Sequence, residues 1–133
     1  MKTYVLSHFS ALHWLLSHQD PRVGNNAPYL DVPASSDAPD SQVVEELRWT
    51  IGLEGPLDFL VIGDGALRRS SAVRPHRCSQ DIPFGSLIPI ACRAHDAEML
   101  VCCPELAFLQ ICQAVDTLAA IYFGMCVCSD FRF

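Results

Sequence analysis

The chain has 133 residues, of which 50% are hydrophobic and 18% charged; this is enough apolar material for one domain core and argues against disorder. Its formal net charge of −6 opposes nonspecific affinity for nucleic acid. No apolar run reaches the roughly 18 residues that span a bilayer, and the first residues lack the apolar segment of a signal peptide, so we expect a cytoplasmic protein without a membrane association.

We expect a single domain over residues 1–133, with a mainly helical part at 1–55. Residues 4–6 are predicted to be a short strand or an extended entry, and Ser7 or Ser10 to cap a helix that runs through Leu16. A loop follows, and residues 29–32 could form a short strand. Ser41 is then expected to cap a second helix. The apolar residues predicted on one face of that helix are Val43, Val44, Leu47 and Ile51.

The β region is predicted at residues 56–103. Its clearest strand is the apolar, partly β-branched run Leu57–Ile62, which Pro56 and Gly63 bound. Three further strands are expected at residues 72–78, 87–92 and 98–102, with a hairpin around 93–96. Pro75 indicates an edge strand, because proline cannot donate a hydrogen bond to the ladder.

Two C-terminal helices are predicted at residues 104–133. Pro104 suits the first position of a helix, where its missing N–H costs nothing, and Glu105 suits the positive end of the helix dipole. Asp116 or Thr117 is expected to cap the last helix. That helix is predicted to bury Leu118, Ile121, Tyr122 and Met125. Together the patterns predict an α+β fold in which a small, mainly antiparallel sheet of three or four strands packs against an N-terminal and a C-terminal helix pair.

Several segments, taken in order, resemble the body of bacterial proteins related to abortive-infection type IV toxin–antitoxin antitoxins. They are Ser10-Ala11-Leu12, residues 56–61, Arg68-Arg69-Ser70, Val73-Arg74-Pro75-His76, residues 83–87 and residues 104–110. Some relatives carry a very-short-patch-repair-like endonuclease domain after this body. The chain departs from the pattern at Cys103, where the family usually has a capping serine, and after Cys128. The resemblance therefore implies a stand-alone or truncated member that stops before any nuclease domain.

The resemblance raises nuclease chemistry, which needs two carboxylates to hold a metal and usually a neighbouring lysine. Asp58 and Asp64 flank the clearest strand. The only lysine in the sequence is Lys2, however, so an acidic-x-Lys strand motif cannot be built. We therefore expect no catalytic residues and no enzymatic activity.

Other chemistry is weakly indicated. His76, Cys78, Cys92 and His95 have zinc ligand types and could meet across adjacent strands, but separated His and Cys pairs are common by chance, and we expect no metal and no cofactor. The seven cysteines are an odd number without a secretion signal, which favours reduced, mostly buried thiols over disulfides. Cys103, at a helix N-terminus, could be reactive through a lowered thiol pKa, but no paired base is identifiable.

An arginine group is the local excess of positive charge in this acidic chain. It consists of Arg68, Arg69, Arg74 and Arg77. Alternation along a strand places Arg74 and His76 on one face and Arg77 on the other. The group could contact phosphates of DNA or RNA, or an acidic partner, and the alternative is a solvated edge strand that its charges protect from aggregation.

The function expected from the resemblance is a non-catalytic regulatory or interaction module of the antitoxin-like kind, with a toxin protein as partner. One alternative is a DNA-associated accessory fragment of an endonuclease whose catalytic domain is absent. Another is a zinc-stabilised structural protein. The arginine group would be the contact surface for a protein or nucleic-acid partner.

Overall fold

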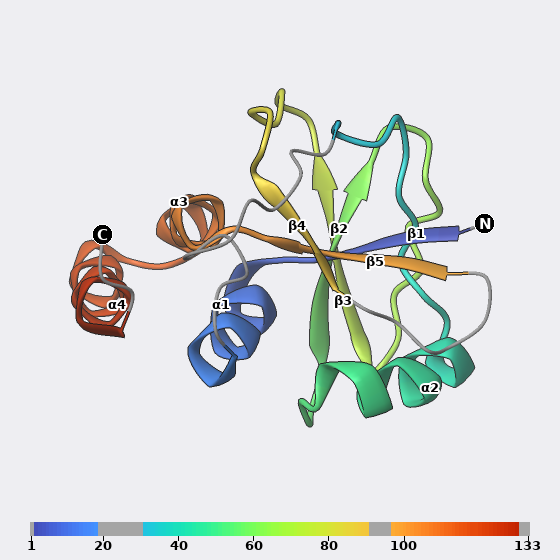
Figure 1. The fold of residues 1–133 in the computed structure, drawn as a ribbon, viewed down its shortest axis with the longest axis horizontal. Helices are drawn as coiled ribbons and strands as arrows, with labels where there is room; N and C mark the ends of the chain where they lie inside the picture. Colours follow the sequence, from blue (N-terminus) through green and yellow to red (C-terminus); the bar gives the residue numbers. More distant parts are fainter. Residues whose placement is uncertain (1, 19–30, 91–96, 131–133) are drawn as a thin grey trace.

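The computed structural model describes residues 2–18, 31–90 and 97–130. Its centre is a five-stranded sheet with the strand order β3-β2-β1-β5-β4 (Figure 1). The strands are β1 (Lys2–Leu6), β2 (Leu57–Ile62), β3 (Val73–Cys78), β4 (Leu87–Ile90) and β5 (Ala97–Cys102). β1 pairs parallel with β5 and antiparallel with β2, while β2–β3 is parallel and β4–β5 antiparallel. The sheet is therefore mixed.

The predicted α+β class is confirmed, but a mainly antiparallel sheet of three or four strands matches the structure only roughly. The difference comes chiefly from β1, which occupies the central position. Tyr4, Val5 and Leu6 are all buried, because a central strand is covered on both faces. Such a strand shows no alternation of apolar and polar residues that would mark it in the sequence.

Other strand predictions hold more closely. β2 has the predicted bounds, and β3 lies at an edge of the sheet, as Pro75 indicates. The hairpin predicted at residues 93–96 lies outside the described residues. The short strand predicted at 29–32 lies partly outside them, and its described residues 31 and 32 are not in a strand.

The helices are α1 (His8–Ser17), α2 (Ser41–Ile51), α3 (Pro104–Ala114) and α4 (Thr117–Asp130). Asp40 rather than Ser41 caps α2, since its carboxylate accepts a hydrogen bond from Val43 N at 2.9 Å. α3 begins at Pro104 as predicted. Asp116 caps α4 by accepting a hydrogen bond from Ala119 N at 2.9 Å.

α1, α3 and α4 gather at one end of the sheet, and α2 lies apart from them (Figure 1). A main core joins the sheet to α2 through Val44, Leu47 and Ile51, and to α1 through Trp14 and Leu15. Among the described residues, no helix is long and apolar enough to cross a membrane.

The prediction that α4 buries its apolar residues is wrong. Leu118 is 80% exposed, Ile121 55%, Tyr122 64% and Met125 68%. α4 packs mainly against α3, where Gly124 lies close to the Phe108 ring, and it stands at the outside of the molecule (Figure 1). The four exposed residues therefore face away from the contact between α4 and α3. Sequence periodicity identifies an apolar stripe but not the partner that covers it.

Candidate functional site

Asp58 is a carboxylate buried at the start of β2, with 2% of its surface exposed. The end of β1 lies on one side of it, because Leu6 pairs with Phe59, and Arg74 of β3 lies opposite it on the other side. An ionised carboxylate is costly to bury unless hydrogen bonds and opposite charges compensate it. Its surroundings should therefore supply donors from several elements.

The first turn of α1 supplies two of these donors. Asp58 Oδ2 accepts hydrogen bonds from Ser10 N at 3.3 Å and from Ser10 Oγ at 3.2 Å, while Asp58 N donates to Ser10 Oγ at 2.8 Å. Ser7, at the N-cap position, makes no side-chain capping bond. Asp58 thus caps α1 from another element, which ties the helix to the sheet.

β3 supplies the cationic donors. Arg74 spans both carboxylate oxygens, with Nε 3.1 Å from Oδ1 and one terminal nitrogen 3.2 Å from Oδ2. His76 Nε2 lies 2.9 Å from Oδ1. Burial by itself raises the pKa of Asp58, but the hydrogen bond from His76, the charges of Arg74 and His76 and the hydrogen bond from Ser10 together lower it. The carboxylate is therefore held ionised.

His8 completes what we call the Asp58 cluster, which consists of His8, Ser10, Asp58, Arg74 and His76. The His8 ring stacks on His76 with centroids 3.8 Å apart, and its Nδ1 lies 2.8 Å from Ser7 Oγ. Its φ of 51° is in the left-handed region, which disfavours residues other than glycine. His8 N donates to Gln110 of α3 at 3.0 Å. These contacts fix the chain where β1 passes into α1.

The Asp58 cluster contains residue types used in acid–base and nucleophilic catalysis, but its geometry fits a structural clamp. Both oxygens of Asp58 are engaged by protein donors, and the Ser10 hydroxyl is one of them. Ser7 is fully buried. Asp64 lies in the turn beyond the other end of β2, so it is not brought together with Asp58.

We expect stability to fall as the pH drops from 7 to 4, and His8→Asn to remove part of this loss. Burial, and then the charge of His76, lower the pKa of His8 to about 4, although Asp58 opposes this and Arg74 adds to it. Between about pH 6.5 and 4 the unfolded chain thus binds a proton at His8 that the native state does not. The loss should be about 1–2 kcal/mol, since solvent screens this partly exposed ring.

Urea unfolding at several pH values would measure this, with His13→Asn at an exposed position of the same helix as control. Asparagine tolerates the left-handed φ at position 8. The lowered pKa of Asp58 acts in a different window: its stabilisation is present above the unfolded carboxyl pKa and is lost as the pH falls through the lower folded value. If the free energy of unfolding fell equally with pH in wild type and His8→Asn between pH 6.5 and 4, the assignment of this loss to His8 would be contradicted.

The arginine group is only partly brought together. Arg74 and His76 share a face, as predicted, and Arg77 instead donates to Gly63 O at 2.7 Å and Gly65 O at 3.3 Å. Arg68 pairs with Asp40 at 3.5 Å. Arg69 is exposed. Three of the four guanidinium groups thus have intramolecular partners, and contact with phosphate or an acidic partner stays a prediction.

The zinc candidates cannot be placed as a set, because Cys92 and His95 lie outside the described residues. His76 Nε2 is engaged by Asp58, and Cys78 Sγ contacts Gln80 O at 3.1 Å. Within residues 2–18, 31–90 and 97–130 no group of three His, Cys, Asp or Glu side chains could hold a metal ion. Cys103, the candidate reactive thiol, is 5% exposed.

A second feature is the α4 face, defined as the exposed residues Leu118, Ile121, Tyr122 and Met125. The α4 residues have the spacing i, i+3, i+4 and i+7 of a continuous helical stripe. No charged residue occurs from 117 to 128. Monomeric proteins rarely leave a contiguous apolar patch exposed unless it is an interaction surface.

Sequence reasoning missed the Asp58 cluster, although one signal for it was present. Asp58 interrupts the apolar run Leu57–Ile62, and a carboxylate within a buried strand requires compensating partners. The partners themselves come from residues 8–10 and 74–76, and only the topology brings them together.

Comparison of the chain with protein-family models, curated proteins and solved structures finds no match.

Proposed function

We propose that the protein is a non-catalytic interaction module that binds a partner protein through the α4 face. The observation that carries this proposal is the exposure of a continuous apolar stripe on a helix with no charged residue from 117 to 128. A helix that is apolar all round is normally buried in a larger core. Here α3 covers only part of it.

The chemistry of the α4 face selects a protein as its occupant. Nucleic acid is bound through cationic side chains, and helices that lie on membranes usually carry Lys and Arg on their polar face. Residues 117–128 contain no Lys and no Arg. The spacing of Leu118, Ile121 and Met125 is that of helical anchors that enter an apolar groove. The formal net charge of −6 opposes close association of two copies, so we favour a different protein.

The resemblance to antitoxin-like proteins gives the partner its proposed identity, a toxin-like protein of a bacterial defence system. In this proposal the module regulates its partner by contact rather than by chemistry. The partner would present an apolar groove that accepts one face of a helix.

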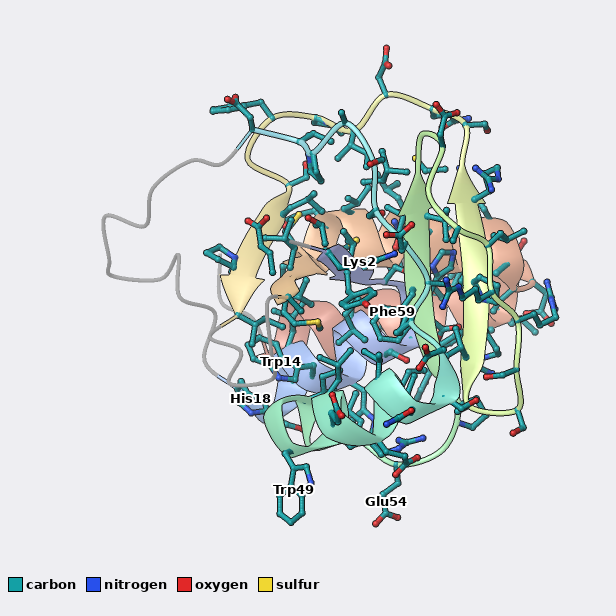
Figure 2. The ribbon with its side chains drawn as sticks, turned by 90° about the vertical axis from the view of Figure 1, so that its right-hand side faces the viewer. Lys2, Trp14, His18, Trp49, Glu54 and Phe59 are labelled. Carbon is teal, nitrogen blue, oxygen red and sulfur yellow. The ribbon has the colours of Figure 1, made fainter. Side chains whose placement is uncertain are left out.

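Substituting Leu118, Ile121 and Met125 together by serine is expected to weaken binding to a toxin-like partner protein at least about 100-fold, because each anchor loses more than about 1 kcal/mol of apolar contact. Isothermal titration calorimetry on the purified pair measures the affinity. The matched control is Trp49→Ala, which removes a side chain that is 92% exposed and projects from α2 (Figure 2).

Three outcomes would contradict the proposal: no binding between the two proteins, equal loss with Trp49→Ala, or binding that the triple substitution leaves unchanged. Sedimentation of the chain alone separates one further case. A stable dimer that the triple substitution dissociates would show that a second copy occupies the α4 face. Binding to DNA that needs Arg69 and Arg74 would instead favour the nucleic-acid alternative.

A further inference from the structure

Met125 is the sulfur-containing residue of the α4 face, and 68% of its surface is exposed. It follows Ile121 by about one helical turn and Leu118 by about two, so its side chain continues the same apolar stripe. Methionine is over-used at surfaces that bind other proteins, because its unbranched, polarisable side chain adapts to an apolar groove. The same thioether is a group that mild oxidants modify.

The fold exposes Met125 selectively. Met99 of β5 is 1% exposed and belongs to the main core, so an oxidant reaches its sulfur only when the protein opens. Met1 lies outside the described residues. A peroxide in solution should therefore oxidise Met125 in the native protein well before Met99, since the reaction needs access to the sulfur atom.

The described thiols are less accessible than this thioether. Cys102 and Cys103 are buried, and Cys78 and Cys112 are half-buried. Burial raises the pKa of the Cys102 thiol to about 12, which keeps it in the protonated form that reacts poorly with oxidants. Met125 is thus more exposed than any of these four thiols.

Hydrogen peroxide converts a thioether to a sulfoxide in a two-electron oxidation of the sulfur. The sulfur lone pair attacks one peroxide oxygen, and the O–O bond breaks as the S–O bond forms. The departing hydroxide takes the proton of the transferred oxygen and leaves as water. The side chain keeps its length but becomes polar, and burying the new acceptor oxygen in an apolar groove without a donor is unfavourable.

We propose that oxidation of Met125 to the sulfoxide switches off partner binding, so that the α4 face is a redox-sensitive surface. This inference rests on the proposed function of the α4 face and adds its regulation. A methionine sulfoxide reductase would restore the thioether and the binding, with two thiols oxidised to a disulfide and the oxygen released as water. A bound partner would in turn slow the oxidation of Met125, because linkage between the two events is reciprocal.

Peptide mass spectrometry of the full chain after brief exposure to hydrogen peroxide tests the modification itself. Cleavage at Glu98 and Glu105 places Met99 and Met125 on different peptides. Met125 should be oxidised at least about tenfold faster than Met99 in the native protein, and unfolding in urea should remove the difference. Equal rates in the native protein would overturn the proposal.

Calorimetry with the toxin-like partner protein measures the effect on binding, and retention of the chain alone on phenyl-agarose gives a readout that needs no partner. Both follow treatment with dithiothreitol, which reverses disulfides and leaves sulfoxides in place. Oxidation should weaken partner binding at least about tenfold, the effect of burying one unpaired polar group, and it should shorten retention.

Met125→Leu keeps an apolar side chain of similar volume that peroxide does not oxidise. It should bind the partner about as tightly as the reduced wild type and should be insensitive to peroxide in both measurements. Met99→Leu is the matched control and should stay as sensitive as the wild type. Treatment of the oxidised wild type with methionine sulfoxide reductase should restore both binding and retention.

A reduced chain that does not bind the partner would contradict the proposed function, and this inference with it. A reduced chain that binds, together with an oxidised chain that binds as tightly, would overturn the inference alone and leave the α4 face as the binding surface. Sensitivity to peroxide that persists in Met125→Leu would also overturn the inference, because it would assign the switch to another group.

Discussion

Replacing Asp58 with alanine is expected to lower the free energy of unfolding by about 3 kcal/mol, because it removes one member of a buried, hydrogen-bonded charge network. The substitution leaves Ser10 N without the acceptor that caps α1, and it leaves Arg74 and His76 without the carboxylate that neutralises them. Three elements, α1, β2 and β3, lose their common contact. The loss should therefore exceed that of an ordinary surface carboxylate.

Urea unfolding of the purified variant measures this loss, with Asp64→Ala as the matched control. Asp64 is an exposed aspartate in the turn after β2, and its removal should change stability by no more than about 0.5 kcal/mol. Asp58→Asn keeps the shape and an acceptor oxygen but not the charge, so we expect an intermediate loss. If Asp58→Ala were no more destabilising than Asp64→Ala, the cluster would not act as a clamp.

The parts of the fold that follow from local pattern were predictable. β2 is bounded by Pro56 and Gly63, and α3 starts at a proline, so both are marked by residues whose backbone preferences are strong. The central place of β1 was not predictable in this way. It results from pairing with β5, whose register joins Val5 to Leu100 over more than 90 residues of sequence, and no local pattern records such a partner.

The same distinction between local pattern and distant partner applies to the α4 face and to the arginine group. The stripe of Leu118, Ile121 and Met125 is visible in the sequence as apolar spacing, and what failed was the assumption that the chain itself covers it. Arg74 was identified by its charge, and the shared face with His76 followed from strand alternation. The partner of Arg74 was not identified, because only the parallel pairing of β2 with β3 places Asp58 opposite Arg74. A charge in the sequence therefore indicates that a partner is needed without saying where it is.

Gly65→Ala is expected to destabilise the protein by about 3 kcal/mol, because a Cβ there would overlap the carbonyl oxygen of Ser36. That oxygen cannot easily move. Ser36 N donates to Ile62 O at 3.1 Å, and Ser36 Oγ donates to Leu60 O at 2.7 Å and accepts from Ile62 N at 3.0 Å. The segment that leads into α2 is thus fixed against the end of β2, and the backbone must shift to admit a methyl group.

Gly55→Ala separates this steric effect from the general cost of replacing glycine. Gly55 has a φ of 77° and no atom within 4 Å of an added Cβ, so its substitution should cost only the left-handed strain of about 1–2 kcal/mol. Urea unfolding of both variants gives the comparison. A Gly65→Ala variant no less stable than Gly55→Ala would show that this segment adapts, and that it is held less rigidly than the hydrogen bonds of Ser36 imply.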